Sequence, residues 1–376
     1  MIAANTLNAV LTHLKNTFVG KDEIADLLGV CLVAKENAFL LGPPGTAKSA
    51  IVRQLSACIE GGKNFEYLLT RFTEPNEIFG PFDIRRLKDG ELVTNTEGMM
   101  PEASLVFLDE IFNANSAILN SLLMALNEKV FRRGKETIRL PALMFVGASN
   151  AMPEEEALAA LLDRFLVRVK SENVDPELLD VVLTAGWKLE NDQLATPPSI
   201  TPAEIQTLQR QCRQVDLSPI RKAYVDLVHH LRTTGIRVSD RRAVKVQNLL
   251  AASALLAGRT AANLSDLWVM KHIWDTEEQI EILAGIVGRV IEKDESPLPH
   301  PQATVNRAPN AEGLAREVQA LREKWESGKL SFEEKNLVKD KLRYVQTRAG
   351  WVSHSPQKDF LNSQIEALWQ TILQTA

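Results

Sequence analysis

The feature that most constrains the fold of this chain is a loop with the sequence Gly42-Pro43-Pro44-Gly45-Thr46-Ala47-Lys48-Ser49. It follows the apolar run 38–41, which is typical of a buried strand, and it precedes good helix formers over 49–55. In a strand, glycine-rich loop and helix arrangement, backbone N–H groups and the helix N-terminus surround an anion. The sequence therefore predicts a phosphate-binding loop, in which Lys48 reaches the β- and γ-phosphates of a nucleotide and the Ser49 hydroxyl ligates Mg²⁺.

One position departs from the general pattern, because Ala47 precedes the lysine where the pattern has glycine. Alanine costs little at the first turn of a helix if its backbone takes right-handed helical angles. We therefore interpret Ala47 as a tolerated variant with such angles. The alternative for the whole stretch is a glycine and proline turn with a solvated lysine, and the loop alone leaves it open.

The composition is that of an ordinary globular protein. The chain has 376 residues, enough for two or three domains, with 45% hydrophobic and 24% charged residues. A net charge of −5 gives no general attraction to nucleic acid or to anionic membranes. The three cysteines and six histidines lack metal-ligand spacing. With no signal segment and no apolar run near the ~20 residues of a membrane span, we expect a soluble, cytoplasmic protein.

Apolar runs around the loop alternate with helical patterns. Helical spacing over 5–32 is interrupted at 17–21, and we assign Val19 and Gly20 in this break to the nucleotide-binding residues. Later strands are expected at 65–69, 103–110, 143–150 and 166–169. Strands alternating with helices indicate a parallel, helix-covered sheet and an α/β fold class.

Two segments interrupt this alternation. The segment 71–100 is too long for a simple connection, contains the turn signal Asp89-Gly90, and is expected to have small secondary structure of its own. A second hairpin is expected over 131–140, with its turn near Arg133-Gly134. Beyond about residue 175 helical patterns dominate. We therefore expect a nucleotide-binding core over 1–185, a helical second domain over 186–295, a proline-rich linker over 296–310 and a helical extension over 311–376.

An acidic pair, Asp109-Glu110, ends the apolar strand that follows the segment 71–100. Asp109 would hold the hydrated metal together with Ser49, and Glu110 would polarise the attacking water as general base. The competing interpretation is a helix N-cap followed by a first-turn acid. The presence of Lys48 and Ser49 favours the catalytic role.

Several later polar residues are candidates for the same chemistry. Asn150 ends the third apolar strand and could hold the attacking water, although loop asparagines are often turn formers. Arg164 either complements a helix end or acts as an arginine finger on a neighbour's γ-phosphate. Arg241 opens a helix of the second domain and could reach the nucleotide from there. Arg242 is its direct competitor.

The combination resembles a known family, the AAA+ ATPases of the MoxR group, and most closely its RavA branch. The resemblance covers about residues 5–295 and includes a helix-2 insert. It rests on the phosphate loop, Leu108-Asp109-Glu110-Ile111, Ser149-Asn150, Leu162-Asp163-Arg164-Phe165, Ser239-Asp240-Arg241 and Leu69-Thr70-Arg71-Phe72 with Glu77-Ile78-Phe79-Gly80. Ala47 and Asn113 depart from the group's pattern, and the stretch 310–376 is too short and too helical for the β-rich insertion that RavA-like proteins can carry.

The resemblance implies an AAA+ αβα core with a parallel sheet and a helix-2 insert, an all-α lid domain and a small helical C-terminal extension. It also implies a hexameric ring that binds ATP and Mg²⁺ between subunits. In that ring Arg164 would act on the neighbour's nucleotide, Asn150 would be the first sensor and Arg241 the second. We accordingly expect Mg²⁺-dependent ATP hydrolysis that drives chaperone-like remodelling or activation of a protein partner, expected to contain a von Willebrand factor A (VWA) domain.

Two alternatives remain open from the sequence. A nucleic-acid-stimulated translocase is supported by a basic hairpin that could follow a phosphate backbone. Its residues are Lys129, Arg132, Arg133, Lys135 and Arg139. The acidic balance of the chain and the lack of an aromatic stacking surface in that hairpin count against it. A nucleotide-gated scaffold with negligible hydrolysis would require Glu110 or Arg164 to be idle.

Overall fold

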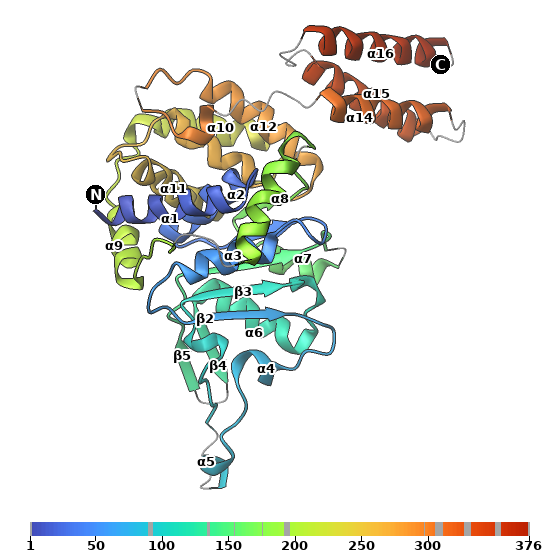
Figure 1. Cartoon of the computed structure of the whole chain (residues 1–376). Helices are drawn as coiled ribbons and strands as arrows, with labels where there is room; N and C mark the ends of the chain where they lie inside the picture. Colours follow the sequence, from blue (N-terminus) through green and yellow to red (C-terminus); the bar gives the residue numbers. More distant parts are fainter. Residues whose placement is uncertain are drawn as a thin grey trace. The chain divides into compact units, whose positions relative to one another are not determined.

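The computed structural model describes most of the chain, namely residues 2–88, 93–133, 136–153, 155–174, 176–191, 196–296, 298–304, 311–326, 332–349 and 355–374. It divides into two compact units, Met1–Thr304 and Val305–Ala376 (Figure 1). Each unit has its own hydrophobic core. The residues of the candidate site all belong to the first unit.

A five-stranded sheet of order β2-β3-β6-β1-β7 forms the centre of the first unit. Its strands are β1 (Ala38–Leu41), β2 (Asn64–Leu68), β3 (Leu105–Asp109), β6 (Met144–Ser149) and β7 (Val167–Lys170). All neighbouring strands are parallel, and β1 aligns Ala38 with Val146 of β6 and Val167 of β7. Figure 1 shows β2 and β3 running side by side in one direction. The α/β parallel sheet predicted from the apolar runs is confirmed.

Helices pack around this sheet. They are α1 (Ile2–Thr17), α2 (Asp22–Ala34), α3 (Lys48–Ala57), α6 (Ser116–Glu128) and α7 (Glu156–Leu162). Helix α2 is buried at every position from Ile24 to its end, because it lies between α1 and the helical part that follows the sheet. A Cβ atom on Gly29 would come within 2.5 Å of the Leu11 side chain, so α1 and α2 pack closely at this glycine.

The two predicted interruptions of the sheet are present. The segment 71–100 contains the short helices α4 (Pro75–Phe79) and α5 (Ile84–Lys88), and Phe82 forms a β-bridge with Thr94. In Figure 1, α5 lies at the end of this segment farthest from the sheet. The second interruption is the antiparallel hairpin of β4 (Val130–Arg133) and β5 (Glu136–Arg139). The turn signals Asp89-Gly90 and Gly134 lie outside the described residues.

The chain is helical after β7, as predicted, and the described residues there contain no named strand. The helices are α8 (Leu179–Glu190), α9 (Pro202–Cys212), α10 (Arg221–Thr233), α11 (Asp240–Leu256) and α12 (Glu278–Ile291). The 3₁₀ segments after β7 are η3 (Pro176–Leu178), η4 (Ser218–Ile220) and η5 (Leu264–His272). Two others, η1 (Met100–Glu102) and η2 (Ile111–Asn113), lie on either side of β3. Ser239 begins α11, because its hydroxyl accepts a hydrogen bond from the Arg242 backbone N–H.

The predicted linker starts later than expected. His300 is buried and stacks on Trp268 with 4.8 Å between ring centroids, and the Gln302 amide donates to Asp26 at 2.6 Å. The short helix α13 (Pro301–Thr304) therefore packs on the first unit, which extends to Thr304 rather than ending at 295. Residues 305–310 of the predicted linker lie outside the described residues.

The second unit consists of α14 (Ala311–Glu326), α15 (Phe332–Ala349) and α16 (Ser355–Gln374). Its core is formed by residues at helical spacing on all three helices. They are Leu314, Val318, Leu321, Trp325, Val338, Leu342, Val345, Ala349, Leu361, Ile365, Leu368 and Ile372. The extension expected over 311–376 is thus helical, and its three helices pack on one another.

Candidate nucleotide-binding site

The predicted phosphate loop follows β1, between the ends of β6 and β7. Gly42 donates from its N–H to the Ser149 carbonyl at 3.1 Å, and the Ser171 hydroxyl donates to the Thr46 carbonyl at 2.8 Å. A Cβ atom on Gly42 would lie 2.0 Å from the Ser171 carbonyl oxygen, so only glycine fits there. A Cβ atom on Gly45 would meet nothing within 4 Å, so the outer side of the loop is open to a ligand. Crevices at the carboxyl ends of parallel strands are the usual ligand sites of such sheets.

The backbone of Ala47 differs from the sequence-based expectation. It has φ 63° and ψ 20°, which is left-handed, and helix α3 begins only at Lys48. The expected right-handed angles are wrong, because the loop ends one residue later than we assumed. Left-handed angles cost a non-glycine residue about 1–2 kcal/mol, which explains why the general pattern has glycine here. Backbone strain of this kind is concentrated at functional sites.

The Lys48 side chain joins the loop to the end of β6. Its ammonium group donates to the carbonyls of Gly42 at 2.6 Å and Pro43 at 2.9 Å, and to the Asn150 side-chain oxygen at 3.1 Å. Burial lowers the pKa of Lys48, while Asp109 and Glu110 oppose that shift. Lys48 and Asn150, far apart in sequence, thus lie side by side. The present partners of the Lys48 ammonium are neutral oxygens, and a charged phosphate would bind it more strongly than they do.

The acidic pair lies on the other side of the loop. The Ser49 hydroxyl donates to an Asp109 carboxylate oxygen at 3.0 Å. Glu110 also has a left-handed backbone, with φ 50°, and its carboxylate lies 3.5 Å from the Ser149 hydroxyl. One hydroxyl and one carboxylate, completed by substrate oxygens and water, form a ligand set that suits Mg²⁺. Within the described ranges no three His, Cys, Asp or Glu residues cluster as an all-protein metal site.

The break at Val19-Gly20 lies against the chain that follows β7. A Cβ atom on Gly20 would lie 3.0 Å from Val174 and 3.7 Å from Leu178, and Lys21 donates to the Glu172 carbonyl. The same stretch holds the phosphate loop through Ser171. Sequence reasoning missed Ser171, although a small polar residue directly after a buried strand is a signal that could have identified it.

The two candidate arginines lie elsewhere. Asn37, directly before β1, donates its side-chain amide to the Arg164 carbonyl at 3.1 Å, whereas the phosphate loop follows the other end of β1. Arg241 shares a small cleft with Arg164. The cleft is lined by Asn127, Asp163, Arg164, Leu166, Ser239, Arg241, Arg242 and Lys245. The expectation that Arg241 reaches the nucleotide of its own chain is therefore wrong, because α11 begins at the opposite end of the strand.

Arg164 and Arg241 are both available for an anion. Arg164 pairs only with the exposed Asp163 carboxylate at 2.8 Å, and its buried Nε finds no acceptor in the described part of the chain. Arg241 is exposed and donates to the Asn127 side-chain oxygen at 3.1 Å. Pairs with an exposed partner contribute little stability, so both arginines can exchange these partners for an anion.

Arg242, the competitor of Arg241, has a structural role. It is buried, donates to the Asp275 carboxylate at 2.8 Å and to the Ile273 carbonyl at 2.5 Å. Asp275 also pairs with the buried Arg168 of β7. One carboxylate thus pairs with two guanidinium groups and joins α11 to the sheet. Of the two arginines, Arg241 is the exposed one.

This ion-pair cluster allows a stability prediction. Asp275→Ala is expected to lower the free energy of unfolding by about 3 kcal/mol, since it leaves two buried cations without their carboxylate. Burial would raise the pKa of Asp275, but Arg242 and Arg168 hold it below its ordinary value. A carboxyl with a lowered folded-state pKa stabilises fully above its unfolded pKa, so this contribution should begin to fall below about pH 4 and be lost as the pH drops through the folded-state pKa.

Urea denaturation at pH 7 and at pH 3.5 measures both effects. Glu66→Ala is the matched control, because Glu66 forms an exposed pair with Arg53. Its replacement should lower the free energy of unfolding by no more than about 1 kcal/mol. An equal loss for the two variants at pH 7 would show that the Asp275 cluster does not hold α11.

The basic hairpin proposed for nucleic acid is engaged within the protein. The Lys129 ammonium is largely buried and donates to the Ala142 and Leu143 carbonyls at 3.0 and 2.9 Å, and burial lowers its pKa to about 8. Arg133 donates to Gly80 and Asn76 and stacks on Phe82 at 3.8 Å. The Arg133 contacts hold the hairpin to the segment 71–100. Lys135 lies outside the described residues.

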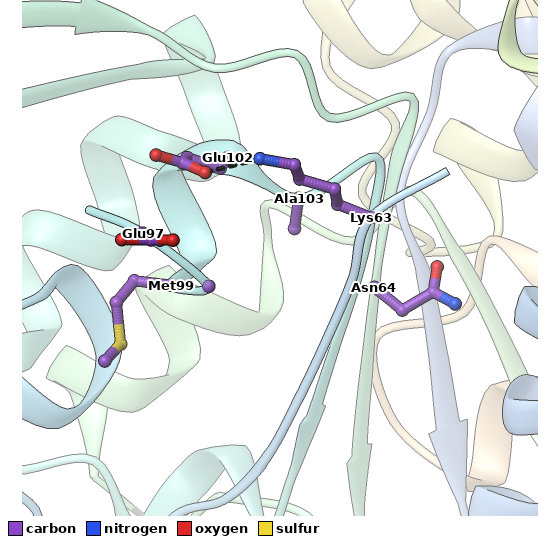
Figure 2. Close-up of a pocket in the computed structure, with 7 residues that line it drawn as sticks. Lys63, Asn64, Glu97, Met99, Glu102 and Ala103 are labelled. Atoms are coloured by element: carbon purple, nitrogen blue, oxygen red, sulfur yellow. Dashed lines mark hydrogen bonds and ion pairs between the residues drawn. The ribbon is translucent and has the colours of Figure 1, made fainter. Parts of the chain in front are cut away.

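A larger cavity of about 390 Å³ lies away from the predicted site. Its lining residues are Lys63, Asn64, Glu97, Gly98, Met99, Glu102 and Ala103. Figure 2 shows the Lys63 side chain directed at Glu102, with which it pairs at 2.6 Å. Because Asn64 begins β2, this cavity is at the amino end of the sheet and shares no residue with the phosphate loop.

A phosphate loop after the first strand of a parallel sheet, a serine and aspartate pair beside it and a following helical domain define an AAA+ ATPase. Comparison with family models agrees: one described as the MoxR domain in the MoxR-vWA-beta-propeller ternary systems matches residues 5–210, and an AAA lid domain matches residues 217–287. The chain belongs to the MoxR family of AAA+ ATPases.

Individual relatives support this membership. An uncharacterized protein of Methanocaldococcus jannaschii is 34% identical over 291 residues, covering 76% of this chain and 75% of the relative. The chaperone MoxR1 of Mycobacterium tuberculosis is 27% identical over 177 residues, 46% of each chain. A crystal structure of a Cytophaga hutchinsonii protein matches with a TM-score of 0.63 at 18% identity, covering 78% of this chain and 95% of the other, which supports the fold.

Proposed function

We propose that this chain hydrolyses ATP with Mg²⁺ in a ring of identical subunits and uses the reaction to remodel or activate a protein partner. The observation that carries the proposal is the separation of the catalytic groups along β1. Lys48, Ser49 and the acidic pair lie at its carboxyl end, and Arg164 lies at its amino end. An arginine placed there can complete only a neighbour's site. Such head-to-tail contacts close into rings.

Each residue has a defined role in this proposal. Lys48 and the loop N–H groups hold the phosphates, while Ser49 and Asp109 would hold Mg²⁺, which neutralises charge on the phosphate oxygens when bound. Glu110 takes a proton from the attacking water, and Asn150 positions that water. Arg164 and Arg241 of the adjacent subunit stabilise charge that develops on the γ-phosphate. The number of subunits, six, follows from the family resemblance.

The proposed partner is a protein with a VWA domain. Its support is the description of the matched family model, which places MoxR domains in systems with VWA and β-propeller components. The contacts that engage Lys129 and Arg133 make the nucleic-acid alternative less favourable. In the described ranges no helix is long and apolar enough to cross a membrane. A cytoplasmic location, the RavA-like branch and a boundary at 185 between the core and the helical domain remain proposals.

A trapping experiment tests the partner. Tagged Glu110→Gln protein, incubated with ATP in lysate of the source organism, should retain a VWA-domain protein because hydrolysis no longer releases it. Lys48→Ala is the control, since it should lose nucleotide binding and therefore the partner. Equal recovery of the VWA protein by both variants, or recovery of nucleic acid alone, would contradict the proposed function.

A further inference from the structure

Helix α8 carries an unusual concentration of exposed apolar side chains. None of its residues is buried, and Leu179, Leu183 and Trp187 are 51%, 63% and 66% exposed. Because these three follow one another at intervals of four, they form one stripe along the helix, which we call the α8 stripe. The opposite side of α8 is half-buried against the protein. Exposed apolar patches of this kind mark interaction surfaces.

The α8 stripe lies next to the nucleotide-binding site. The stretch that leads into α8 contacts the phosphate loop through Ser171 and the Val19-Gly20 break through Val174 and Leu178. A protein that approaches this nucleotide from outside therefore meets α8. If an adjacent subunit supplies Arg164 and Arg241, that subunit is the nearest candidate.

The face that carries those arginines matches the α8 stripe in character. Val244, one turn after Arg241 on α11, is 63% exposed. The exposed Arg237 and half-buried Lys245 lie near it in sequence, and Lys245 pairs with the buried Glu36. With Arg164 and Arg241 these bases outnumber the exposed acids of this face, Asp163 and Asp240. The α8 stripe is flanked by acidic residues instead, namely Glu177, Asp180 and Glu190, against the single base Lys188. An apolar and basic face is thus available to cover an apolar and acidic one. Complementary charges of this kind orient an association.

We propose that the α8 stripe is an intersubunit contact, covered by the face around Val244 of a second copy of this chain. The proposal rests on the proposed function, because it requires Arg241 to act on a neighbour's nucleotide. The two faces lie toward opposite ends of β1, so the contact is head-to-tail and repeats around a ring. When the neighbouring subunit is bound, this contact fixes the position of α8 and of the stretch that borders the nucleotide.

Cross-linking between two different subunits tests the contact. Leu183→Cys protein and Val244→Cys protein are mixed with ATP in a Glu110→Gln background and treated with a short bismaleimide. The native cysteines Cys31, Cys58 and Cys212 are all buried, so the background is low. We expect an ATP-dependent dimer only when both variants are present. Val225→Cys, on α10, replaces Val244→Cys in the control and should give none.

Two further measurements separate the possible failures. Leu183→Glu should weaken ATP-dependent assembly at least about tenfold in sedimentation, while nucleotide binding is unchanged. Acrylamide quenching of Trp187, obtained by difference from Trp187→Phe, should be lost on assembly. Mixing inactive Arg164→Ala and Glu110→Gln subunits shows, by recovered ATP turnover, whether the ATP sites are shared between subunits. If the sites are shared, but no cross-link forms and Trp187 stays accessible until a VWA protein is added, the intersubunit contact is wrong. The α8 stripe then binds the partner protein. If the subunits do not assemble with ATP at all, the proposed function itself fails.

Discussion

Replacing Glu110 with glutamine is expected to lower ATP turnover by about 10²–10⁴-fold and to leave nucleotide binding intact. Glutamine has the size of glutamate but cannot accept the proton of the attacking water. The Lys48 and Ser49 side chains donate their hydrogen bonds to other groups, so the phosphate-binding groups should keep their positions. Phosphate release measures turnover, and titration with a fluorescent ATP analogue measures binding.

Glu128→Gln is a suitable control for this change. Glu128 is an exposed acid at the end of α6, where it pairs with Arg132 at 3.5 Å. Its replacement should alter turnover less than about twofold, because exposed pairs contribute little. Wild-type turnover by Glu110→Gln would remove Glu110 as the general base and revive the interpretation of the acidic pair as a helix cap.

Replacing Arg164 with alanine is expected to reduce turnover by about 10³–10⁵-fold, the range found for arginine fingers. The effect should appear only in the assembled state, because the nearest nucleotide for Arg164 belongs to the adjacent subunit. The folded state should be affected much less than turnover, since the half-buried Arg164 side chain pairs with an exposed carboxylate, that of Asp163. Turnover is measured across protein concentration, together with the thermal midpoint.

Arg132→Ala serves as the matched control, because Arg132 is an exposed arginine with a weak surface pair. It should retain wild-type turnover at every protein concentration. If Arg164→Ala also retains turnover, the cleft of Arg164 and Arg241 has no catalytic role, and the scaffold interpretation gains support.

Much of the fold follows from local patterns. The buried strands were predictable because parallel strands covered on both faces are continuous apolar runs, as at 38–41 and 103–108. The phosphate loop, Ser49, Asp109 and Asn150 were predictable because each directly follows such a run, and the carboxyl ends of parallel strands meet at one edge. The core of the second unit was visible in its helical spacing.

What sequence patterns missed depends on contacts between distant segments. The left-handed backbone of Ala47 is imposed by where α3 begins, and a residue type alone does not reveal it. The basic hairpin looked like a surface for nucleic acid, but Lys129 and Arg133 are engaged by carbonyl groups from other segments. Likewise, nothing local separates Arg241 from Arg242. Only the position of Asp275 shows which of the two is buried.

The central claim is that each ATP site combines residues of two subunits, and complementation tests it most directly. Arg164→Ala subunits and Glu110→Gln subunits, each inactive alone, are mixed and their ATP turnover is measured across mixing ratios. Subunits that assort at random in a closed ring should restore activity at about a quarter of the sites in an equal mixture, where an intact Glu110 faces an intact Arg164. Absence of recovered turnover at every ratio, with mixed assembly verified, would contradict the shared site.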